Sequence, residues 1–391
     1  MWQKSLPSDI ANNSGRNNYY FLPFILGLIG LIFHYNKDKK SFYVLLILFL
    51  FTSLALKVFL NERPFEPRER DYAVVPSFYV FAMWLGFGVF AIYEESKKRI
   101  SPKIAVPVVL ATSFFAAPVL MASQNWDDHN RSGKNTAWVM AKAYLDSCEP
   151  NAILFTIGDN DTFPLWYLQE IENYRTDVRI VNTQLLNTDW YIDQMKAKAY
   201  ESEGAPITFT HNQYVGNHRD YVIVKEITKD TLSIKQYLDF IKSDDPRGTE
   251  TLRNGQVVNT APARNVRIPV NKENALKYGI INESQKDSVV SDIVITIKDQ
   301  AIMKNRLMML DILANSDWKR PIHFTGGSFG DDDFIWLKEY LQLNGMVYQL
   351  VPIKTPLQRN ASPLDMGTID SEKMYKTVTN WDLGSNGNPD V

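Results

Sequence analysis

The stretch ILFTIGDNDTFPLWYLQE, residues 153–170, indicates the fold class of the soluble part of the chain. A β-branched apolar run ends at Gly158, and a helical pattern follows Pro164. Ligands bind where the strands of an open α/β sheet run into helices. Asp159 and Asp161 stand at that point and are therefore candidate substrate-binding residues. The alternative is that Asp161 or Thr162 only caps the helix, with Pro164 in its first turn.

Strands and helices alternate outward from this stretch, which predicts βαβ units and a soluble α/β domain with a mostly parallel sheet. We expect this domain over 123–354, with an inserted lobe over 201–290 and an extended tail or linker over 355–391. The expected elements are a helix at 135–147, a strand at 152–157, a helix at 164–173, a strand at 177–183, a helix at 189–200, and later helices at 301–316 and 333–343.

The second strand of this pattern also ends in a polar turn, LLNTDW, which contains Asn187 and Asp189. The carboxyl ends of parallel neighbouring strands meet at one edge of the sheet. We therefore expect at least one of Asp159 and Asp161 to face a pocket that also contains polar groups of this turn. Asn187 and Asp189 join the candidate substrate-binding residues.

Four apolar runs precede the soluble domain, at 19–35, 42–60, 73–93 and 104–122. Each is close to the roughly 20 residues that cross a bilayer core. They predict a multi-pass α-helical membrane segment of four spans over 19–122, behind a polar N-terminal tail at 1–18. Buried helices of a soluble protein are the alternative.

The basic residues fall in alternate connections, NKDKK after the first run and EESKKRISPK after the third. The positive-inside rule places both connections in the cytoplasm and the soluble domain outside. The N-terminus then also lies outside, although no cleavable signal precedes the polar tail. The simplest explanation is that the chain is the rear part of a longer membrane protein.

The amino-acid composition argues against nucleic-acid binding and excludes some kinds of cysteine site. The formal net charge is −2 and no basic stripe stands out, which argues against a nucleic-acid partner. The single cysteine, Cys148, excludes an intramolecular disulfide and a four-cysteine zinc site. Asp127, Asp128 and His129 follow the last apolar run and are candidate ligands of a divalent metal. The alternative is a solvated loop that caps the next helix.

The second connection, NERPFEPRERDY, carries Arg63, Arg68 and Arg70. The guanidinium group is suited to bidentate contacts with phosphate, and a lipid headgroup lies at this depth. These arginines are therefore candidate ligands of a lipid phosphate. The alternative is an ion-paired loop that docks the soluble domain onto the membrane.

Several long strings carry a family resemblance: NNYYFLPFILGLIGLIFHYNKDKKSF, PRERDYAVVPSFYVFAMWLGFGV, NWDDHNRSG, NAILFTIGDNDTFPLWYLQEIENYRTDVRIVN, LLNTDWYIDQMK and RPIHFTGG. Together they resemble the C-terminal portion of a bacterial multi-pass membrane family of unknown function that is described as protein O-mannosyltransferase-like. The resemblance covers most of residues 17–391. It implies a glycosyltransferase-related protein whose catalytic carboxylate lies in a front half that this chain lacks.

Two functions follow as hypotheses. The first is the rear membrane and periplasmic portion of a glycosyltransferase-like protein of the bacterial inner membrane, which uses a polyprenyl-phosphate sugar and receives a glycan or protein acceptor. The second is a non-enzymatic, membrane-anchored module that binds glycans or proteins. A third, in which Asp159 and Asp161 chelate a metal on a nucleotide sugar, conflicts with the expected topology, because nucleotide sugars are made in the cytosol.

Overall fold

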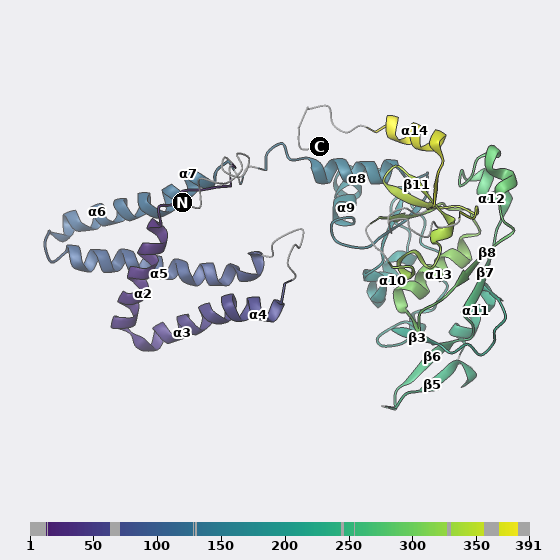
Figure 1. The fold of residues 1–391 in the computed structure, drawn as a ribbon, viewed down its shortest axis with the longest axis horizontal. Helices are drawn as coiled ribbons and strands as arrows, with labels where there is room; N and C mark the ends of the chain where they lie inside the picture. Colours follow the sequence, from purple (N-terminus) through teal and green to yellow (C-terminus); the bar gives the residue numbers. More distant parts are fainter. Residues whose placement is uncertain are drawn as a thin grey trace, which may run out of the picture. The chain divides into compact units, whose positions relative to one another are not determined.

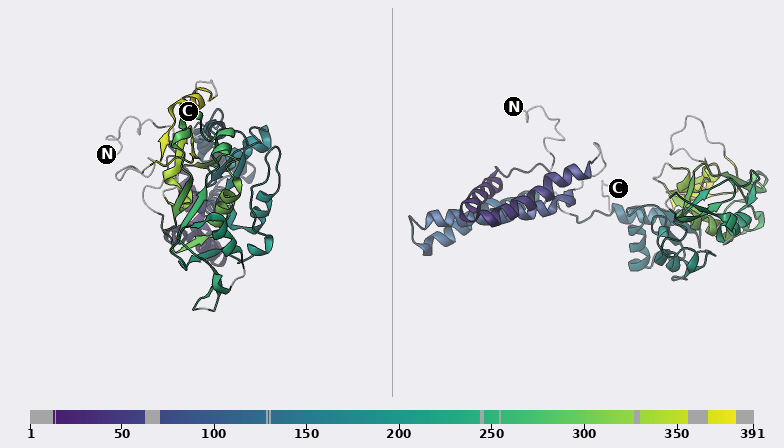
Figure 2. Two further views of the ribbon diagram at one scale, coloured as in Figure 1. Left: turned by 90° about the vertical axis from the view of Figure 1, so that its right-hand side faces the viewer. Right: turned by 90° about the horizontal axis from the view of Figure 1, so that it is seen from below.

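The computed structural model describes residues 13, 15–62, 71–127, 129, 131–243, 246–253, 255–326, 330–355 and 367–381. The chain divides into two compact units, Met1–Ser132 and Gly133–Val391. Figures 1 and 2 show helices alone in the first unit and helices with strands in the second. We refer to them as the membrane unit and the soluble unit.

The membrane unit contains three helices that are long and apolar enough to cross a membrane, at Lys39–Leu60, Tyr72–Ser96 and Pro102–Asn125. The first apolar run instead forms a shorter helix, α2, because Tyr20 and Phe21 adopt positive φ angles and the helix begins after them. Of the four predicted spans, three are thus confirmed as helices long and apolar enough to cross a membrane. The helices are α2 (Leu22–Lys37), α3 (Lys39–Leu50), α4 (Leu56–Leu60), α5 (Val75–Ser96), α6 (Pro102–Phe114) and α7 (Leu120–Asn125), with π-helical turns at Phe51–Ala55 and Phe115–Val119.

Glycines allow α2 to cross α5 at close range (Figure 1). A Cβ atom on Gly30 of α2 would lie 1.7 Å from the carbonyl oxygen of Trp84. A Cβ atom on Gly88 of α5 would lie 2.1 Å from the carbonyl oxygen of Leu26. Small residues that let two backbones approach are a common feature of helix packing in membranes. The apolar sequence therefore also specifies how these two helices contact each other.

The soluble unit is built on a six-stranded sheet in the order β13-β11-β12-β10-β1-β2. Strand β1 is parallel to β2 and β10, as the alternation of strands and helices predicts. Strand β12 is antiparallel to both of its neighbours, so the sheet is mixed rather than mostly parallel. The strands are β1 (Ile153–Thr156), β2 (Arg179–Asn182), β10 (Ile322–Thr325), β11 (Leu341–Asn344), β12 (Val347–Leu350) and β13 (Thr368–Ile369).

Two smaller sheets, which share this unit, draw on residues between β2 and the helix α13. One has the order β5-β6-β3-β9, and the other has the order β4-β7-β8; both combine parallel and antiparallel pairs. Their strands are β3 (Tyr221–Val224), β4 (Leu232–Ser233), β5 (Thr249–Thr251), β6 (Val257–Ala261), β7 (Asn265–Pro269), β8 (Asp292–Thr296) and β9 (Ala301–Met303). The helices of the unit are α8 (Thr136–Asp146), α9 (Phe163–Glu172), α10 (Asp189–Lys196), α11 (Ile234–Lys242), α12 (Lys272–Lys277), α13 (Lys304–Ser316) and α14 (Ser371–Thr379).

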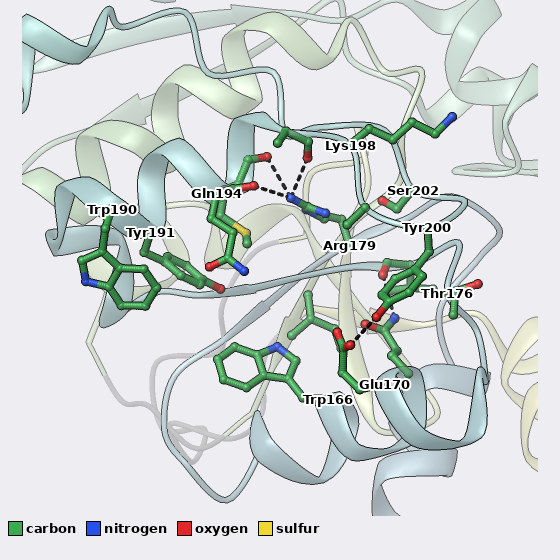
Figure 3. A pocket seen from close by; sticks show the side chains of 16 residues that line it. Trp166, Glu170, Thr176, Arg179, Trp190, Tyr191, Gln194, Lys198, Tyr200 and Ser202 are labelled. Atoms are coloured by element: carbon green, nitrogen blue, oxygen red, sulfur yellow. Dashed lines mark hydrogen bonds between the residues drawn. The ribbon is translucent and has the colours of Figure 1, made fainter.

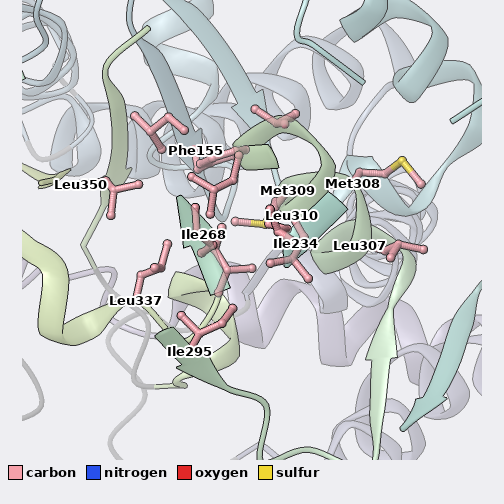
Figure 4. Packing of buried hydrophobic residues seen from close by; sticks show 14 of the residues in the cluster. Phe155, Ile234, Ile268, Ile295, Leu307, Met308, Met309, Leu310, Leu337 and Leu350 are labelled. Atoms are coloured by element: carbon pink, nitrogen blue, oxygen red, sulfur yellow. The ribbon is translucent and has the colours of Figure 1, made fainter. Parts of the chain in front are cut away.

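The main core forms around α13, which is buried along nearly its whole length. Its residues Leu307 and Leu310 belong to one cluster with Phe155 of the six-stranded sheet and Ile268 of the three-stranded sheet (Figure 4). A second cluster covers the other face of the six-stranded sheet, where α8 and α9 pack against Leu154. Successive residues of β1 thus face opposite layers, as side chains of a strand do.

The segment beyond residue 354 differs from the expected extended tail in its described part. Residues 367–381 contain β13, which pairs with β11, and the helix α14. Gly367 enters this strand with a φ of 68°, and a Cβ atom there would lie 1.4 Å from the carbonyl oxygen of Leu341. The segment therefore returns to the edge of the sheet.

Candidate functional site

The predicted carboxylates at the end of β1 serve the turn in which they stand. The carboxylate of Asp161 accepts hydrogen bonds from the amides of Ile157 (2.9 Å) and Gly158 (2.7 Å) and from the hydroxyl of Thr325 on β10. Asp159 is exposed, and its carbonyl oxygen accepts the amide of Phe163 at the start of α9. Both residues act here on the β1–α9 connection, and neither side chain caps α9, whose N-cap residue Thr162 also makes no side-chain capping hydrogen bond.

The two turns do meet at one edge of the sheet, since Thr156 of β1 is in register with Asn182 of β2. Thr162 connects the two turns. Its hydroxyl oxygen lies 2.7 Å from the hydroxyl oxygen of Thr156 and accepts a hydrogen bond from the side-chain Nδ2 of Asn182 at 2.9 Å. Of the side chains predicted at this edge, Asn187 donates to the carbonyl of Gln184 and accepts from an amide of α13. A neutral side-chain cluster thus joins the strand ends.

Asp189 stands at the start of α10, where its carboxylate accepts the amide of Trp190 at 2.7 Å. This hydrogen bond, followed by one from the amide of Gly216, lowers the pKa of Asp189. A negative charge at a helix N-terminus is stabilised by the helix dipole. The role of Asp189 in this structure is therefore to begin α10.

The other predicted sites fall mostly outside the described residues. This holds for Arg63, Arg68 and Arg70 and for Asp128. Asp127 and His129 are exposed beyond the end of α7, and Nδ1 of His129 lies 3.1 Å from the carbonyl oxygen of Asn125. Within the described ranges, no group of three His, Cys, Asp or Glu side chains could hold a metal ion. The divalent-metal site stays a prediction.

A cavity of about 590 Å³ lies beside β2, the edge strand of the six-stranded sheet. We call it the β2-edge pocket (Figure 3). Helix α9 supplies one wall, and α10 with the segment after it supplies the other. The lining residues are Trp166, Gln169, Glu170, Thr176, Val178, Arg179, Ile180, Trp190, Tyr191, Gln194, Met195, Ala197, Lys198, Ala199, Tyr200 and Ser202.

Local sequence holds the walls of the β2-edge pocket in place. Pro164 lies in the first turn of α9, where its missing amide proton costs nothing. The helix ends at Asn173 in the left-handed conformation. Within it, the amide group of Gln169 donates to the carbonyl oxygens of Arg175 (2.7 Å) and Val178 (2.8 Å), which precede β2. These bonds fix α9 against the start of the edge strand.

The backbone of β2 presents polar groups along its open side. The amides of Arg179 and Thr183 donate to carbonyl oxygens of β1 and its approach, each at 2.8 Å. Alternate residues of a strand face opposite sides in the hydrogen-bonding plane, so Ile180 and Asn182 face away from β1. The amide of Asn182 donates to the hydroxyl of Tyr191 at 2.9 Å. The amide and carbonyl of Ile180 point to the same open edge.

Four aromatic side chains, those of Trp166, Trp190, Tyr191 and Tyr200, line the walls. Trp166 is half-buried, whereas Trp190 is 55% and Tyr200 is 53% exposed at the rim. The hydroxyl of Tyr200 donates to the carboxylate of Glu170, as Figure 3 shows. Tyr191 is buried beneath them, and burial raises its pKa to about 12. The β2-edge pocket therefore combines exposed rings with side-chain amides and one carboxylate.

The sequence analysis does not predict Trp166, Trp190 or Arg179 as site residues, although the sequence contains features that point to them. Each tryptophan follows a polar turn that the sequence analysis predicts to bind substrate; the two stretches are GDNDTFPLW and LLNTDW. Arg179 interrupts an apolar strand, VRIVN, where a charge needs a specific partner. What the sequence lacks is the pairing order that makes β2 an edge.

Comparison with known proteins identifies the family of the soluble unit. The sequence model of the family TMEM260-associated domain 2 matches residues 137–373, which include the β2-edge pocket and most of the soluble unit. No curated protein and no solved structure matches the chain. Because the family model covers more than half of its residues, the chain belongs to the TMEM260-associated domain 2 family.

Proposed function

We propose that this chain is the glycan-binding part of a membrane glycosyltransferase-like protein, and that it holds the sugar in the β2-edge pocket. The observation that carries the proposal is the lining of that pocket, where Trp166, Trp190 and Tyr200 stand beside Gln169 and Gln194. Sugar rings have apolar C–H faces that pack on aromatic rings, and hydroxyl groups that need amide or carboxylate partners. A cavity with both kinds of group suits such a ligand.

The arrangement favours binding over catalysis in this pocket. Transfer of a sugar from a phosphate needs a base for the acceptor hydroxyl and positive groups for the leaving phosphate. Among the described residues that line the pocket, Glu170 is the only carboxylate, and it already accepts a hydrogen bond from Tyr200. The catalytic groups of the proposed transferase therefore belong to a different part of the protein.

The family resemblance of the sequence supports the wider context. In this proposal the donor is a polyprenyl-phosphate sugar, held by Arg63, Arg68 and Arg70. The acceptor is a glycan or a glycosylated protein. The protein lies in a bacterial inner membrane, with the soluble unit in the periplasm and α2 as a fourth span beside the three long helices. The lysine-rich connections support this orientation.

Binding of oligosaccharides by the full chain in phosphatidylcholine nanodiscs tests the proposal. We expect mannotriose or another member of an oligosaccharide array to bind, and Trp166→Ala to weaken that binding about tenfold, because it removes roughly 1.5 kcal/mol of ring contact. Tyr167→Ala is the matched control, since Tyr167 follows on the same helix, is exposed and does not line the pocket. Equal losses in both variants, or an array without a bound sugar, would overturn the proposal.

A second function rests on the open backbone of β2. The amide and carbonyl of Ile180 face the edge, and an extended peptide could add there as a further strand. The chain would then be a protein-binding module. Loss of peptide binding, but not of sugar binding, in Ile180→Pro would identify this alternative, since proline removes the outward amide.

A further inference from the structure

The charges around the β2-edge pocket are unevenly placed. Three lining residues are ionisable at neutral pH with a full charge: Glu170, Arg179 and Lys198. Lys198 pairs with Glu203 at 2.6 Å, and Glu170 is bound by a tyrosine at the rim. Arg179 is only 5% exposed and has no carboxylate partner among the described residues. The deepest charge in the pocket is thus an uncompensated cation.

The hydrogen bonds of Arg179 leave part of its guanidinium group unused. Its Nη2 atom donates to the carbonyl oxygens of Gln194 (2.8 Å), Met195 (3.2 Å) and Ala197 (2.8 Å), drawn as dashed lines in Figure 3. The Nε atom is buried without a partner, and no hydrogen bond forms from Nη1. Arginine has five N–H donors in a planar fork. The Nη1 atom therefore remains available to an acceptor, and the buried Nε atom lacks a partner.

A second guanidinium group, that of Arg320, lies near the first. Arg320 precedes β10, and its Nη2 atom donates to the hydroxyl of Ser202, a lining residue, at 3.1 Å. Its other partners are carbonyl oxygens, including that of Glu203 at 2.9 Å. Burial and then the charge of Arg179 lower the pKa of Arg320 to about 10. Two cations therefore repel each other near the pocket; neutral oxygens accept their hydrogen bonds, and the charge of Glu203 offsets part of the repulsion at Arg320.

Carbonyl oxygens at the end of α10 offset part of this charge, since a helix C-terminus carries partial negative charge. They do not supply the full counter-charge that a buried cation needs. An anion in the pocket would supply this counter-charge and would also accept a hydrogen bond from Arg179. Guanidinium groups bind carboxylate and phosphate through paired hydrogen bonds.

We infer that the β2-edge pocket recognises a sugar that carries an anionic group, a carboxylate or a phosphate, and that Arg179 binds this group with the charge of Arg320 nearby. This inference rests on the proposed glycan binding and names its substrate class. The aromatic residues Trp166 and Trp190 then contact the ring of the sugar, and the guanidinium group sets the preference for charge. A purely structural Arg179, which only closes the end of α10, predicts no such preference.

A pair of probes that differ chiefly in charge separates these cases. Trigalacturonic acid and its methyl ester are titrated into the full chain in phosphatidylcholine nanodiscs and followed by calorimetry. We expect the acid to bind roughly tenfold more tightly than the ester, because charge-assisted hydrogen bonds to a buried group are stronger than hydrogen bonds between neutral groups. Mannose 6-phosphate and mannose form a second pair, which shows whether phosphate replaces carboxylate.

Variants assign the preference to a residue. Arg179→Gln should bring the ratio of acid to ester affinity to about one while the ester still binds. Lys198→Gln is the matched control, because Lys198 lines the same pocket but is paired and exposed, and it should leave the ratio unchanged. Unchanged preference in Arg179→Gln would overturn the assignment of Arg179.

The wild-type protein decides the matter even if Arg179→Gln does not fold. Equal affinities for the charged and neutral member of both pairs would overturn this inference and leave glycan binding standing. Absence of binding by all four probes, together with an empty oligosaccharide array, would overturn the inference and the proposed function together.

Discussion

At the residue scale, Glu149 is a described carboxylate outside the pocket whose pKa is strongly lowered. Its Oε2 atom lies 2.5 Å from Nε2 of the buried His323 on β10, and its Oε1 atom pairs with Lys373 of α14. Burial raises the pKa of Glu149, but the charges and hydrogen bonds of His323 and Lys373 outweigh it and lower the pKa to about 2. One carboxylate therefore connects the centre of the sheet to the returning C-terminal segment.

This connection predicts a dependence of stability on pH. The folded-state pKa of Glu149 lies below the ordinary 4.5, so its contribution is complete above about pH 4.5 and is lost as the pH falls towards 2. We expect Glu149→Gln to reduce the free energy of unfolding by about 3 kcal/mol at pH 7 and to flatten the acid slope in this window. Denaturant unfolding followed by tryptophan fluorescence measures both effects.

Glu170→Gln provides the control, because Glu170 is exposed at the pocket rim and should leave the acid slope unchanged. Parallel pH profiles for the wild type and Glu149→Gln between pH 4.5 and 2 would contradict the assignment.

Individual residues also show what sequence could and could not reveal. The turn after β1 was located correctly, because Gly, Asp and Asn in sequence favour such turns. The partner of Asp161 on β10 could not be seen, since Thr325 is 164 residues away in the chain. The role of Arg179 was hidden for the same reason, because its acceptors lie on α10 and beyond it.

At the scale of elements, periodicity predicted β1, α9 and β2 but not the antiparallel part of the sheet. Residues 333–343 were expected to form a helix; they instead form short 3-10 turns that lead into β11. The signal was Asn344–Gly345 between two apolar segments, which is typical of a hairpin. Gly345 has a φ of 57°, as such a turn requires. This hairpin is the reason that the sheet is mixed.

The contact between α2 and α5 gives a prediction for the membrane unit. Gly88→Ala should destabilise it by about 1–3 kcal/mol, because the new methyl group would meet the Leu26 carbonyl and force the helices apart. Gly86→Ala on the same helix is the matched control, since a Cβ atom at Gly86 meets nothing within 4 Å. Thermal unfolding in detergent micelles, followed by circular dichroism, compares the two. Equal midpoints would show that the close contact is not required.

At the scale of the whole molecule, the proposed function depends on the side of the membrane that the soluble unit occupies. Three long apolar helices lie between the connection with Lys37, Lys39 and Lys40 and the soluble unit. If all three helices cross the membrane, these two segments lie on opposite sides, whether or not α2 is also a span. The lysines favour the cytoplasm, so the soluble unit should meet periplasmic sugars.

Reporter fusions test this orientation directly. Alkaline phosphatase, which is active only outside the cytoplasm, should be inactive when fused after Lys40 or Arg99 and active when fused after residue 130, because lysines flank the first two positions. A cytoplasmic reporter, such as green fluorescent protein, should give the reverse pattern at the same positions and controls for expression. Phosphatase activity after Lys40 and none after residue 130 would place the β2-edge pocket in the cytosol. Its anionic sugar would then be a nucleotide sugar or a sugar phosphate rather than a periplasmic glycan.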